Sequence, residues 1–277
     1  MVDLSDSVAA VGDVHGCVAP LREALYRAGF IDERERWIGE DARLWFLGDL
    51  TDRGPDGIGV LDLVMSLQAQ AADHGGEVGC LLGNHELMLL AAHLPEGRRL
   101  RLMQSGDDDV HALFRERWFG NGGQDADSSR LTDAHLEWIA KLPAMALTAD
   151  GHLLVHADTV GYLEFGESVE AVNESIAALL SDPVDVEEID RLTHLMTKRF
   201  AFASDDGIAA REFLRTFGGR QLVHGHSPIP LLLGIEPHAV TGPLVYAGGY
   251  AVNLDTGLFL GGPCLVCGLP SVPKELP

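Results

Sequence analysis

Near the start of the chain, residues 7–16 read Ser-Val-Ala-Ala-Val-Gly-Asp-Val-His-Gly, a short apolar run followed by a glycine turn that carries an acid and a histidine. The same arrangement returns twice, because apolar runs at 44–47 and 78–82 lead directly into Gly48 and Gly83. A short apolar run that ends at a glycine is typical of a buried β-strand. These three segments therefore predict three short strands, each followed by a polar loop.

A segment with the apolar spacing of a helix follows each of these loops. The predicted helices cover residues 20–28 and 58–71, and a third begins at residue 86. Pro20 supports the first of them, because proline is favoured in the first turn of a helix. Strands and helices that alternate in this way predict an α/β fold (α+β layered), in which functional residues gather in the loops at the carboxyl ends of the strands.

The sequence beyond residue 93 is less regular. Charged and aromatic residues, among them Phe114, Trp118 and Trp138, cluster between residues 94 and 141, and we predict a helical insertion there that covers the site. We expect the whole chain, 1–277, to form a single domain that contains this insertion. The remaining predicted elements are strands at 152–155 and 221–223, helices at 169–180 and 187–200, a closing β-hairpin over 244–260 that turns at 253–257, and a loop after residue 263.

The net charge limits the kinds of partner. The 277 residues include 42 acidic and 20 basic side chains, a net charge of −22, which argues against binding to nucleic acid or to anionic membranes. An anionic substrate is compatible with this charge, because metal ions and a few arginines can dominate the field at one site. An acidic N-terminus without the features of a signal peptide, and the lack of any apolar run long enough for a membrane helix, predict a cytoplasmic protein.

Four cysteines are present, and two of them, Cys264 and Cys267, form a lone C-x-x-C sequence. A zinc site normally needs a second such pair or a pair of nearby histidines. We therefore favour two small, half-buried thiols, with a redox-active pair as the alternative.

Five polar segments at predicted strand ends carry the residue types of a metal site. They are 12–16 (GDVHG), 48–54 (GDLTDRG), 83–86 (GNHE), His156 and 224–226 (HGH). One acid or histidine beside a glycine is usually part of a turn, but five such segments at strand ends favour a shared site. Two metal ions held close together can clamp a phosphate ester and activate water, and they need a bridging carboxylate together with imidazole and oxygen ligands.

Together these motifs resemble those of the calcineurin-like metallophosphoesterase superfamily. Within it they are similar to the phosphoprotein phosphatase family, whose pattern is GDxHG, GDxxDRG and GNHE followed by two later histidines. Segments 28–32 (AGFID) and 81–88 (LLGNHELM) look most like the Shewanella-like bacterial branch of that family. The resemblance spans residues 12–226 and implies a central β-sandwich flanked by helices, with a pair of metal ions at its edge.

The resemblance also implies which residues bind the two divalent metal ions. The implied ligands are Asp13 and His15 for the first ion, Asp49 as the bridge, and Asn84, His156 and His226 for the second. We assign His226 rather than His224, because His226 is followed by the Ser-Pro that fits the family pattern. Oxygen and imidazole ligands without thiolate suit Mn²⁺, which we favour, as well as iron or zinc.

In the same pattern, His85 would be the general acid that protonates the leaving oxygen, with Asp52 as its orienting partner. The Asp52 carboxylate is expected to keep this imidazole protonated near neutral pH. Arg53 would bind the phosphate group with its planar fork, and Asn84 would also contact the phosphate.

The chain departs from the family pattern at Leu82, where many members have a second phosphate-binding arginine. Arg199 or Arg220 could supply that charge, and we favour Arg199. Near the C-terminus, residues 253–257 also resemble a strand and turn of these enzymes, and we interpret Asp255 as a turn residue.

Three functions fit the motifs. The first is a protein phosphatase that acts on phosphoserine, phosphothreonine or phosphotyrosine. The alternative is a hydrolase of dinucleoside polyphosphates such as diadenosine tetraphosphate. Asp52 and Glu86 favour the phosphatase, because the tetraphosphatases similar to this chain often lack the first acid and tend to have Asp in place of the second. The third is a pseudoenzyme that binds phosphorylated partners, which the intact catalytic positions disfavour.

Overall fold

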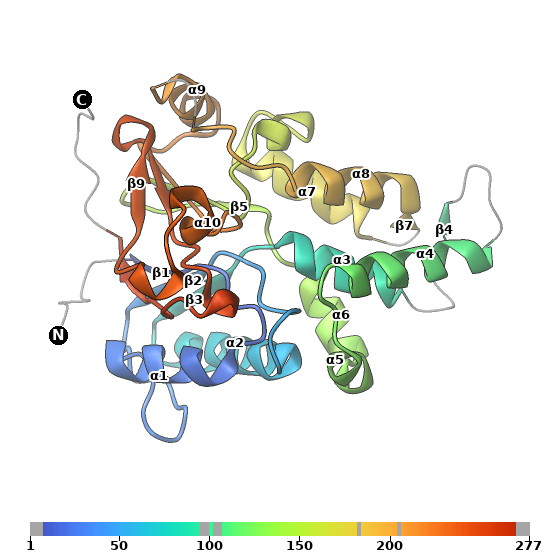
Figure 1. Cartoon of the computed structure of the whole chain (residues 1–277), viewed down its shortest axis with the longest axis horizontal. Helices are drawn as coiled ribbons and strands as arrows, with labels where there is room; N and C mark the ends of the chain where they lie inside the picture. Colours follow the sequence, from blue (N-terminus) through green and yellow to red (C-terminus); the bar gives the residue numbers. More distant parts are fainter. Residues whose placement is uncertain (1–7, 95–99, 102–106, 182–183, 204–205, 270–277) are drawn as a thin grey trace.

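The computed structural model describes residues 8–94, 100–101, 107–181, 184–203 and 206–269. Two β-sheets pack face to face at its centre, and helices cover their outer faces (Figure 1). The predicted layered fold, a central β-sandwich flanked by helices, is confirmed. Within the described ranges no helix combines the length and the apolar character that a membrane span requires.

The first sheet contains the three strands predicted from the glycine-terminated runs, and they lie parallel to one another. In spatial order its strands are β11 (Cys267–Gly268), β1 (Val8–Val11), β2 (Arg43–Phe46) and β3 (Glu77–Cys80). The connecting helices are α1 (Val18–Ala28) and α2 (Gly57–Asp73), which both begin earlier than predicted. The loop predicted after residue 263 is wrong in part, because β11 pairs antiparallel with β1 at the sheet edge. Cys264 and Cys267 are free, half-buried thiols, as predicted.

The second sheet has a parallel centre and antiparallel edges. In spatial order its strands are β5 (Met145–Leu147), β6 (His152–Val155), β8 (Gln221–His224), β10 (Ala251–Asn253) and β9 (Leu244–Tyr246). The middle three strands run parallel, and each edge strand pairs antiparallel with its neighbour. Helices α7 (Val169–Leu179) and α9 (Ile208–Phe217) pack on this sheet. The sequence analysis missed β5, α9 and the short helix α10 (Ile229–Leu233).

Successive residues of a strand face opposite sides of its sheet, which divides the core in two. Ala10 clusters with Leu154 and Val223 of the second sheet, in the layer between the sheets. Its neighbour Ala9 belongs instead to the larger core beneath the helices. Both layers consist of buried apolar side chains, so the polar side chains predicted for the site lie in the loops at the strand ends.

The region predicted as a helical insertion, 94–141, contains three helices among its described residues. They are α4 (Asp107–Gly120), α5 (Asp125–Arg130) and α6 (Asp133–Ile139). Strand β4 (Leu100–Arg101) of this region pairs with β7 (Val184–Asp185). Residues 95–99 and 102–106 of the region lie outside the described part of the chain.

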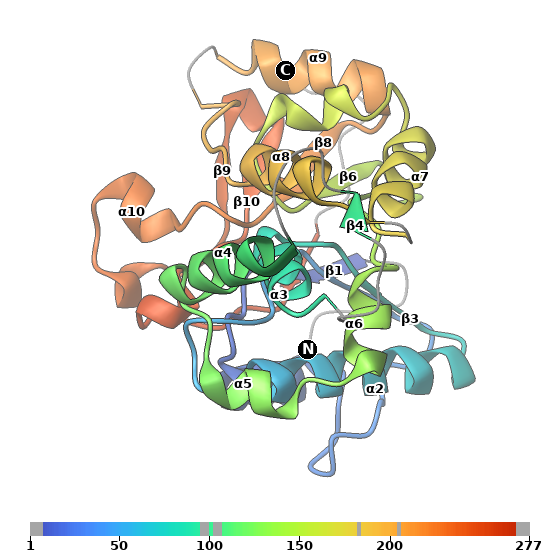
Figure 2. The ribbon, with the colours of Figure 1, turned by 90° about the vertical axis from the view of Figure 1, so that its right-hand side faces the viewer.

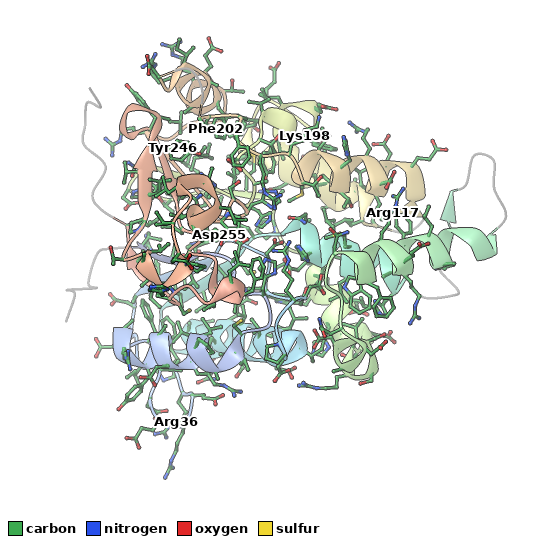
Figure 3. The ribbon with its side chains drawn as sticks, viewed as in Figure 1. Arg36, Arg117, Lys198, Phe202, Tyr246 and Asp255 are labelled. Atoms are coloured by element: carbon green, nitrogen blue, oxygen red, sulfur yellow. The ribbon has the colours of Figure 1, made fainter. Side chains whose placement is uncertain are left out.

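Helix α3 (Asn84–Ala92) carries the insertion on one side of the sandwich. Helix α4 lies along α3 (Figure 2), and α8 (Val186–Met196) also packs against α3. Arg117 of α4 forms an ion pair with Asp190 of α8 (Figure 3). The described part of residues 94–141 is therefore fixed to two helices that lie outside this region.

Two predicted boundaries in the second half of the chain are wrong. Helix α8 ends at Met196 instead of residue 200, because the chain turns at Phe200, whose φ is 68° and whose N–H donates to Asp158 Oδ2 at 2.8 Å. The hairpin of β9 and β10 turns at Ala247–Gly249 instead of 253–257. All three residues of the actual turn have positive φ, which its two glycines accept without strain.

Asp127 of α5 stabilises the start of α2 from outside that helix. It is buried, and its carboxylate oxygens accept the N–H groups of Gly57 at 3.2 Å and Ile58 at 3.1 Å. These N–H groups have no partner within their own helix, because they belong to its first turn. Asp127 therefore connects the insertion to the helix beneath the first sheet.

We expect Asp127→Ala to lower the free energy of unfolding by about 1–3 kcal/mol, because it leaves two buried N–H groups without acceptors. Urea denaturation followed by circular dichroism measures this change. Asp125→Ala, on the exposed face of the same helix, is the matched control and should change the stability by about 0.5 kcal/mol or less. Equal losses in the two variants would contradict this role for Asp127.

Candidate active site

The six side chains predicted as metal ligands lie at the carboxyl ends of strands from both sheets. They follow β1 (Asp13 and His15), β2 (Asp49), β3 (Asn84), β6 (His156) and β8 (His226). The strands that precede them are parallel within each sheet, so their carboxyl ends meet at one edge of the sandwich. All six residues are buried.

The backbone of these loops adopts conformations that most residues avoid. His15, Asp49 and His226 have positive φ values of 46°, 52° and 67°. Such conformations cost energy and persist only where the surrounding structure enforces them. Gly48 has a φ of 95°, and a Cβ added to it would lie 2.8 Å from the backbone of Gly83. Glycine at this position therefore allows the loops after β2 and β3 to touch.

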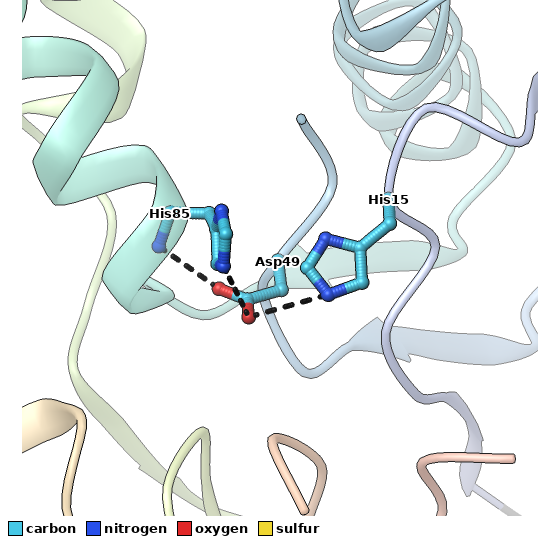
Figure 4. Close-up of side chains that lie close together, drawn as sticks. All are labelled: His15, Asp49 and His85. Carbon is cyan, nitrogen blue, oxygen red and sulfur yellow. Dashed lines mark hydrogen bonds and ion pairs between the residues drawn. The ribbon is translucent and has the colours of Figure 1, made fainter. Parts of the chain in front are cut away.

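Asp49 faces two groups of side chains, one with each carboxylate oxygen. Its Oδ2 lies 3.7 Å from His15 Nε2 and 3.9 Å from His85 Nε2 (Figure 4), whereas its Oδ1 lies 3.2 Å from His156 Nε2. Ligand atoms of His15, Asp49 and His85 all lie within 4.8 Å of one another, and so do those of Asp49, His156 and His226. A carboxylate between two such groups has the placement of a bridging metal ligand.

The remaining predicted ligands lie against these two groups. Asp13 Oδ2 is 3.8 Å from His15 Nε2, and Asn84 Oδ1 is 3.0 Å from His156 Nε2. Both ring nitrogens of His226 are buried and make no hydrogen bond of normal geometry among the described residues, although the backbone of Thr197 lies close enough to the ring to act on its pKa. Buried polar atoms normally have a partner, so these nitrogens fit a ligand that the chain does not itself supply. Carboxylate, amide and imidazole groups together suit a pair of divalent metal ions.

A second arrangement surrounds His85, the predicted general acid. Its Nδ1 lies 2.7 Å from Asp52 Oδ2, and its Nε2 lies 2.9 Å from Arg53 Nη2. The other terminal nitrogen of Arg53, Nη1, lies 2.8 Å from His15 Nε2, and the guanidinium rests 4.4 Å from the centre of the Phe259 ring. The structure thus brings the three predicted residues together beside the metal-binding groups. Phe259 was not predicted, because nothing in its own sequence neighbourhood points to the site.

The motifs and their geometry agree with a known family. A family model described as calcineurin-like phosphoesterase matches residues 7–230, which include all six predicted metal ligands. The chain belongs to the calcineurin-like phosphoesterase family.

Relatives within and around this family carry different names. The symmetrical bis(5'-nucleosyl)-tetraphosphatase of Bordetella parapertussis is 31% identical over 176 residues, which are 64% of this chain and 52% of that protein. The chain therefore spans about half the length of this curated relative. Shewanella-like protein phosphatase 2 of Arabidopsis thaliana is 36% identical over 83 residues, 30% of this chain and 21% of that protein.

Solved structures support the same fold. A cold-active protein-tyrosine phosphatase of a psychrophilic Shewanella species superimposes with a TM-score of 0.63 at 19% sequence identity, covering 93% of this chain and 73% of that one. At this identity the superposition shows a shared fold. The predicted likeness to the Shewanella-like branch is supported by the sequence of the Arabidopsis relative.

Burial and charge set the protonation of the residues that this family would use as ligands. Burial alone would raise the pKa of Asp49, but His156, whose own pKa is raised to about 9 and whose ring is therefore charged, outweighs burial and holds the pKa of Asp49 well below its usual value. Burial lowers the pKa values of His15 and His226 well below the usual range, so both rings are neutral. Ionised carboxylates and neutral imidazoles are the forms that bind metal ions, so a metal ion bound here would have to displace the proton of His156.

The pKa of His85 is lower than expected from its contact with Asp52, which was predicted to keep the ring protonated near neutral pH. Burial lowers the pKa of His85 to about 4, and Arg53 acts in the same direction, although the charge of Asp49 opposes both. A neutral ring with its proton on Nδ1 donates to Asp52 and accepts from Arg53 at Nε2. The expectation is therefore not met in this arrangement, because a guanidinium lies against the nitrogen that would carry the second proton.

Many family members have a second phosphate-binding arginine where this chain has Leu82. Of the two arginines considered as its replacement, Arg199 and Arg220, the structure brings only Arg199 to the site. Its Nε donates to the backbone oxygen of His226 at 3.1 Å. Arg220 precedes the opposite end of β8, where its Nη2 donates to the backbone oxygen of Asp150 at 2.9 Å. Arg220 is therefore too far along the strand to meet a phosphate at the metal-binding groups.

Glu86 has a role that the sequence analysis missed. It is buried, its Oε1 accepts the N–H groups of Leu50 at 2.8 Å and Thr51 at 3.2 Å, and its Oε2 accepts that of Asp49 at 2.8 Å. Burial raises the pKa of Glu86 to about 7. Glu86 therefore fixes the loop of Asp49 to the start of α3, and its fixed place after Asn-His was the signal available for this role.

Asp255 is a turn residue, as predicted, but it also belongs to the surroundings of the site. Its Oδ1 accepts the N–H of Gly257 at 2.9 Å. It is buried in the middle of the molecule (Figure 3), and its Oδ2 has no partner among the described residues. Burial raises the pKa of Asp13 well above its usual value, and the charge of Asp255 adds to this. This proximity could not be predicted from the sequence, because it depends on packing between the two sheets, in which Leu254, after β10, lies against Gly12, after β1.

His226→Ala and His224→Ala should separate the predicted ligand from its neighbour. Both ring nitrogens of His224 have partners, the hydroxyl of Tyr246 at 2.7 Å and the backbone oxygen of Gly225 at 2.8 Å. We expect His226→Ala to weaken Mn²⁺ binding by about a hundredfold or more, and His224→Ala to leave it nearly unchanged. Equilibrium dialysis followed by metal analysis measures both. The reverse result would exchange the roles of the two histidines.

Proposed function

We propose that this protein is a metal-dependent phosphoesterase that hydrolyses phosphate monoesters, and that it acts as a protein phosphatase on phosphoserine, phosphothreonine or phosphotyrosine. One observation carries this proposal: Asp49 lies between two groups of metal-binding side chains, and Arg53 lies against both His15 and His85 at the same place. Metal ions in these two groups and the guanidinium of Arg53 would place positive charge around one small region, which suits the binding of a negatively charged phosphate group. Membership of the calcineurin-like phosphoesterase family supports the same class of reaction.

The metal ions would be held by the residues that the strand ends bring together. The proposed ligands are Asp13, His15 and Asp49 for one ion, and Asp49, Asn84, His156 and His226 for the other. When bound, two divalent ions would neutralise the phosphate and lower the pKa of a water molecule that attacks it. We favour Mn²⁺, with iron or zinc as alternatives, because the ligands are oxygens and imidazole nitrogens without a thiolate.

Arg53 would bind the phosphate group directly. Its two terminal nitrogens point at neighbouring imidazoles, so its planar fork already faces the proposed metal ligands. Stacking on Phe259 holds the plane of the guanidinium. Arg199 lies beside His226, and Asn84 lies beside His156, in the group of Asp49, His156 and His226. We propose that Arg199 and Asn84 contact the same phosphate from this side.

His85 would protonate the leaving oxygen through its Nε2. A phosphate dianion bound by Arg53 would draw the guanidinium away from Nε2 and add negative charge beside the ring. Both changes favour the protonated form of the ring, which is the form that can give a proton. Asp52 would keep the ring in place throughout, because its Oδ2 accepts from Nδ1 at 2.7 Å.

Hydrolysis of dinucleoside polyphosphates is the second candidate, because the Bordetella relative is named as a symmetrical bis(5'-nucleosyl)-tetraphosphatase. The contact between Asp52 and His85 favours the phosphatase, because similar tetraphosphatases often lack this acid. Turnover of diadenosine tetraphosphate that exceeds turnover of phosphopeptides under the same conditions would reverse this order.

Adding Mn²⁺ to chelator-stripped protein should restore hydrolysis of p-nitrophenyl phosphate, and Asp49→Asn should abolish both tight metal binding and activity, because the bridge between the ions is lost. Metal analysis and absorbance of p-nitrophenolate measure the two effects. Asp41→Asn, on an exposed loop, is the control and should behave as the wild type. Inactivity of the wild type with Mn²⁺, iron and zinc would favour a phosphate-binding pseudoenzyme.

His85→Asn should keep the metal content of the wild type and lower kcat by about a hundredfold or more, the scale of a lost general acid. Steady-state kinetics and metal analysis on the same preparation measure this. If the variant loses its metal ions instead, His85 is a ligand, and the role proposed for it is wrong.

A further inference from the structure

The end of α4 and the turn after it contact Asp52 and Arg53, two of the residues that the proposed reaction uses beside the metal ligands. Trp118 Nε1 donates to Asp52 Oδ1 at 2.7 Å, and both side chains are buried. The N–H of Arg53 donates to the backbone oxygen of Gly122 at 2.7 Å. Residues 118–123 are called here the α4 turn. They contact Asp52 and Arg53 although Trp118 follows Asp52 by 66 positions in the sequence.

Asp52 and Arg53 need such support, because their backbone is strained. Their φ values are 68° and 62°, in the left-handed region that residues with a Cβ rarely adopt. Two consecutive residues of this kind persist only where their surroundings enforce the conformation. The α4 turn holds the side chain of the first and the backbone of the second. Gly122 allows this approach, since its φ is 106° and an added Cβ would lie 2.7 Å from Arg53 Cγ.

Trp118 is itself held firmly enough to act as a fixed donor. Its side chain is completely buried, and its ring packs edge-on against His93 with 4.8 Å between ring centres. On another side the ring lies so close to Gly123 that an added Cβ there would be 2.4 Å away. Helix α4 lies along α3 (Figure 2), and the ion pair of Arg117 with Asp190 ties it to α8 (Figure 3).

The two oxygens of Asp52 have different partners. Oδ1 accepts from Trp118, and Oδ2 lies 2.7 Å from Nδ1 of His85. A carboxylate with one bound oxygen can still rotate about its Cβ–Cγ bond, whereas two directed hydrogen bonds fix its plane. Removing the indole N–H would therefore loosen the support of His85 without touching a metal ligand.

We propose that Trp118 is a positioning residue of the reaction: its indole N–H fixes the Asp52 carboxylate so that Asp52 holds His85 in the orientation for proton transfer. Through this contact the insertion becomes part of the machinery that protonates the leaving group. This inference rests on the proposed function, because it takes His85 as the general acid.

The test uses the dependence on the leaving group. A general acid matters most when the leaving oxygen is strongly basic, as in phenyl phosphate, and least when it is a good leaving group, as in p-nitrophenyl phosphate. With Mn²⁺ bound, we expect Trp118→Phe to lower kcat for phenyl phosphate about tenfold and kcat for p-nitrophenyl phosphate about threefold or less. Metal content should equal that of the wild type, and in an Asp52→Asn background Trp118→Phe should cause little further loss.

Trp138→Phe is the matched control. Trp138 also belongs to the insertion, and its Nε1 donates to Gln68 Oε1 at 2.7 Å, away from the site. This variant should leave the ratio of kcat values for the two substrates unchanged. The inference would be overturned if Trp118→Phe lowered kcat equally for both substrates or did not lower it at all. It would also be overturned if the losses of kcat in Trp118→Phe and Asp52→Asn multiplied in the double variant. A wild type that hydrolyses neither ester overturns the proposed function and the inference together.

A second measurement does not depend on the folding of Trp118→Phe. The chain has four tryptophans, so ¹⁵N-labelled tryptophan gives four indole N–H signals, which single Trp→Phe replacements at the other three positions assign. Asp52→Asn should shift the Trp118 signal and leave that of Trp138 in place, because only Trp118 donates to the changed side chain. An unchanged Trp118 signal would overturn the inference.

Discussion

Buried like charges lie close together where the two sheets end, and this electrostatic constraint governs the rest of the structure. The carboxyl groups concerned are Asp13, Asp49, Asp52, Glu86 and Asp255. Repulsion between them is strong, because little water is present to screen it. Imidazoles, backbone N–H groups and Arg53 offset part of it, but burial, with the charges of Asp255 and Asp49 acting in the same direction, still raises the pKa of Asp13 well above its usual value. Divalent cations would supply what is missing, so the same acids that are unfavourable for the folded chain alone define its binding site.

Such a cluster needs a rigid frame, which the sandwich supplies. The strands bury apolar residues on both faces, and their regular hydrogen bonds end just before the ligands begin. Beyond that point the backbone is strained at His15, Asp49 and His226, and side chains such as Glu86 replace the lost hydrogen bonds. Strain gathered at one edge of an otherwise regular fold is typical of a functional site.

The strands, and the gathering of acidic and histidine side chains where they end, could be predicted because both depend on local sequence, whereas the metal-ligand roles rest on the family resemblance and stay proposals. A short apolar run that ends in glycine and an acid specifies the strand, the turn and the donor within a few residues. Contacts made across the fold could not be predicted in this way. Trp118 and Phe259 have no motif around them and reach Asp52 and Arg53 only through packing. The turn of the last hairpin was misplaced for a related reason, since glycine turns occur at both 247–249 and 253–257, and only strand pairing selects between them.

The interaction between Asp52 and Trp118 combines a residue that local sequence identifies with one that only the fold brings to the site. Asp52 lies in a motif that can be recognised from the sequence, whereas its partner lies in a helical region whose residue pattern shows only that it is helical. The carboxylate needs the indole N–H because a buried oxygen without a donor is unfavourable, and the indole needs the carboxylate for the same reason. Each therefore constrains the other during folding. A change in residues 94–141 that moved α4 would therefore alter the support of His85 through the contact between Trp118 and Asp52.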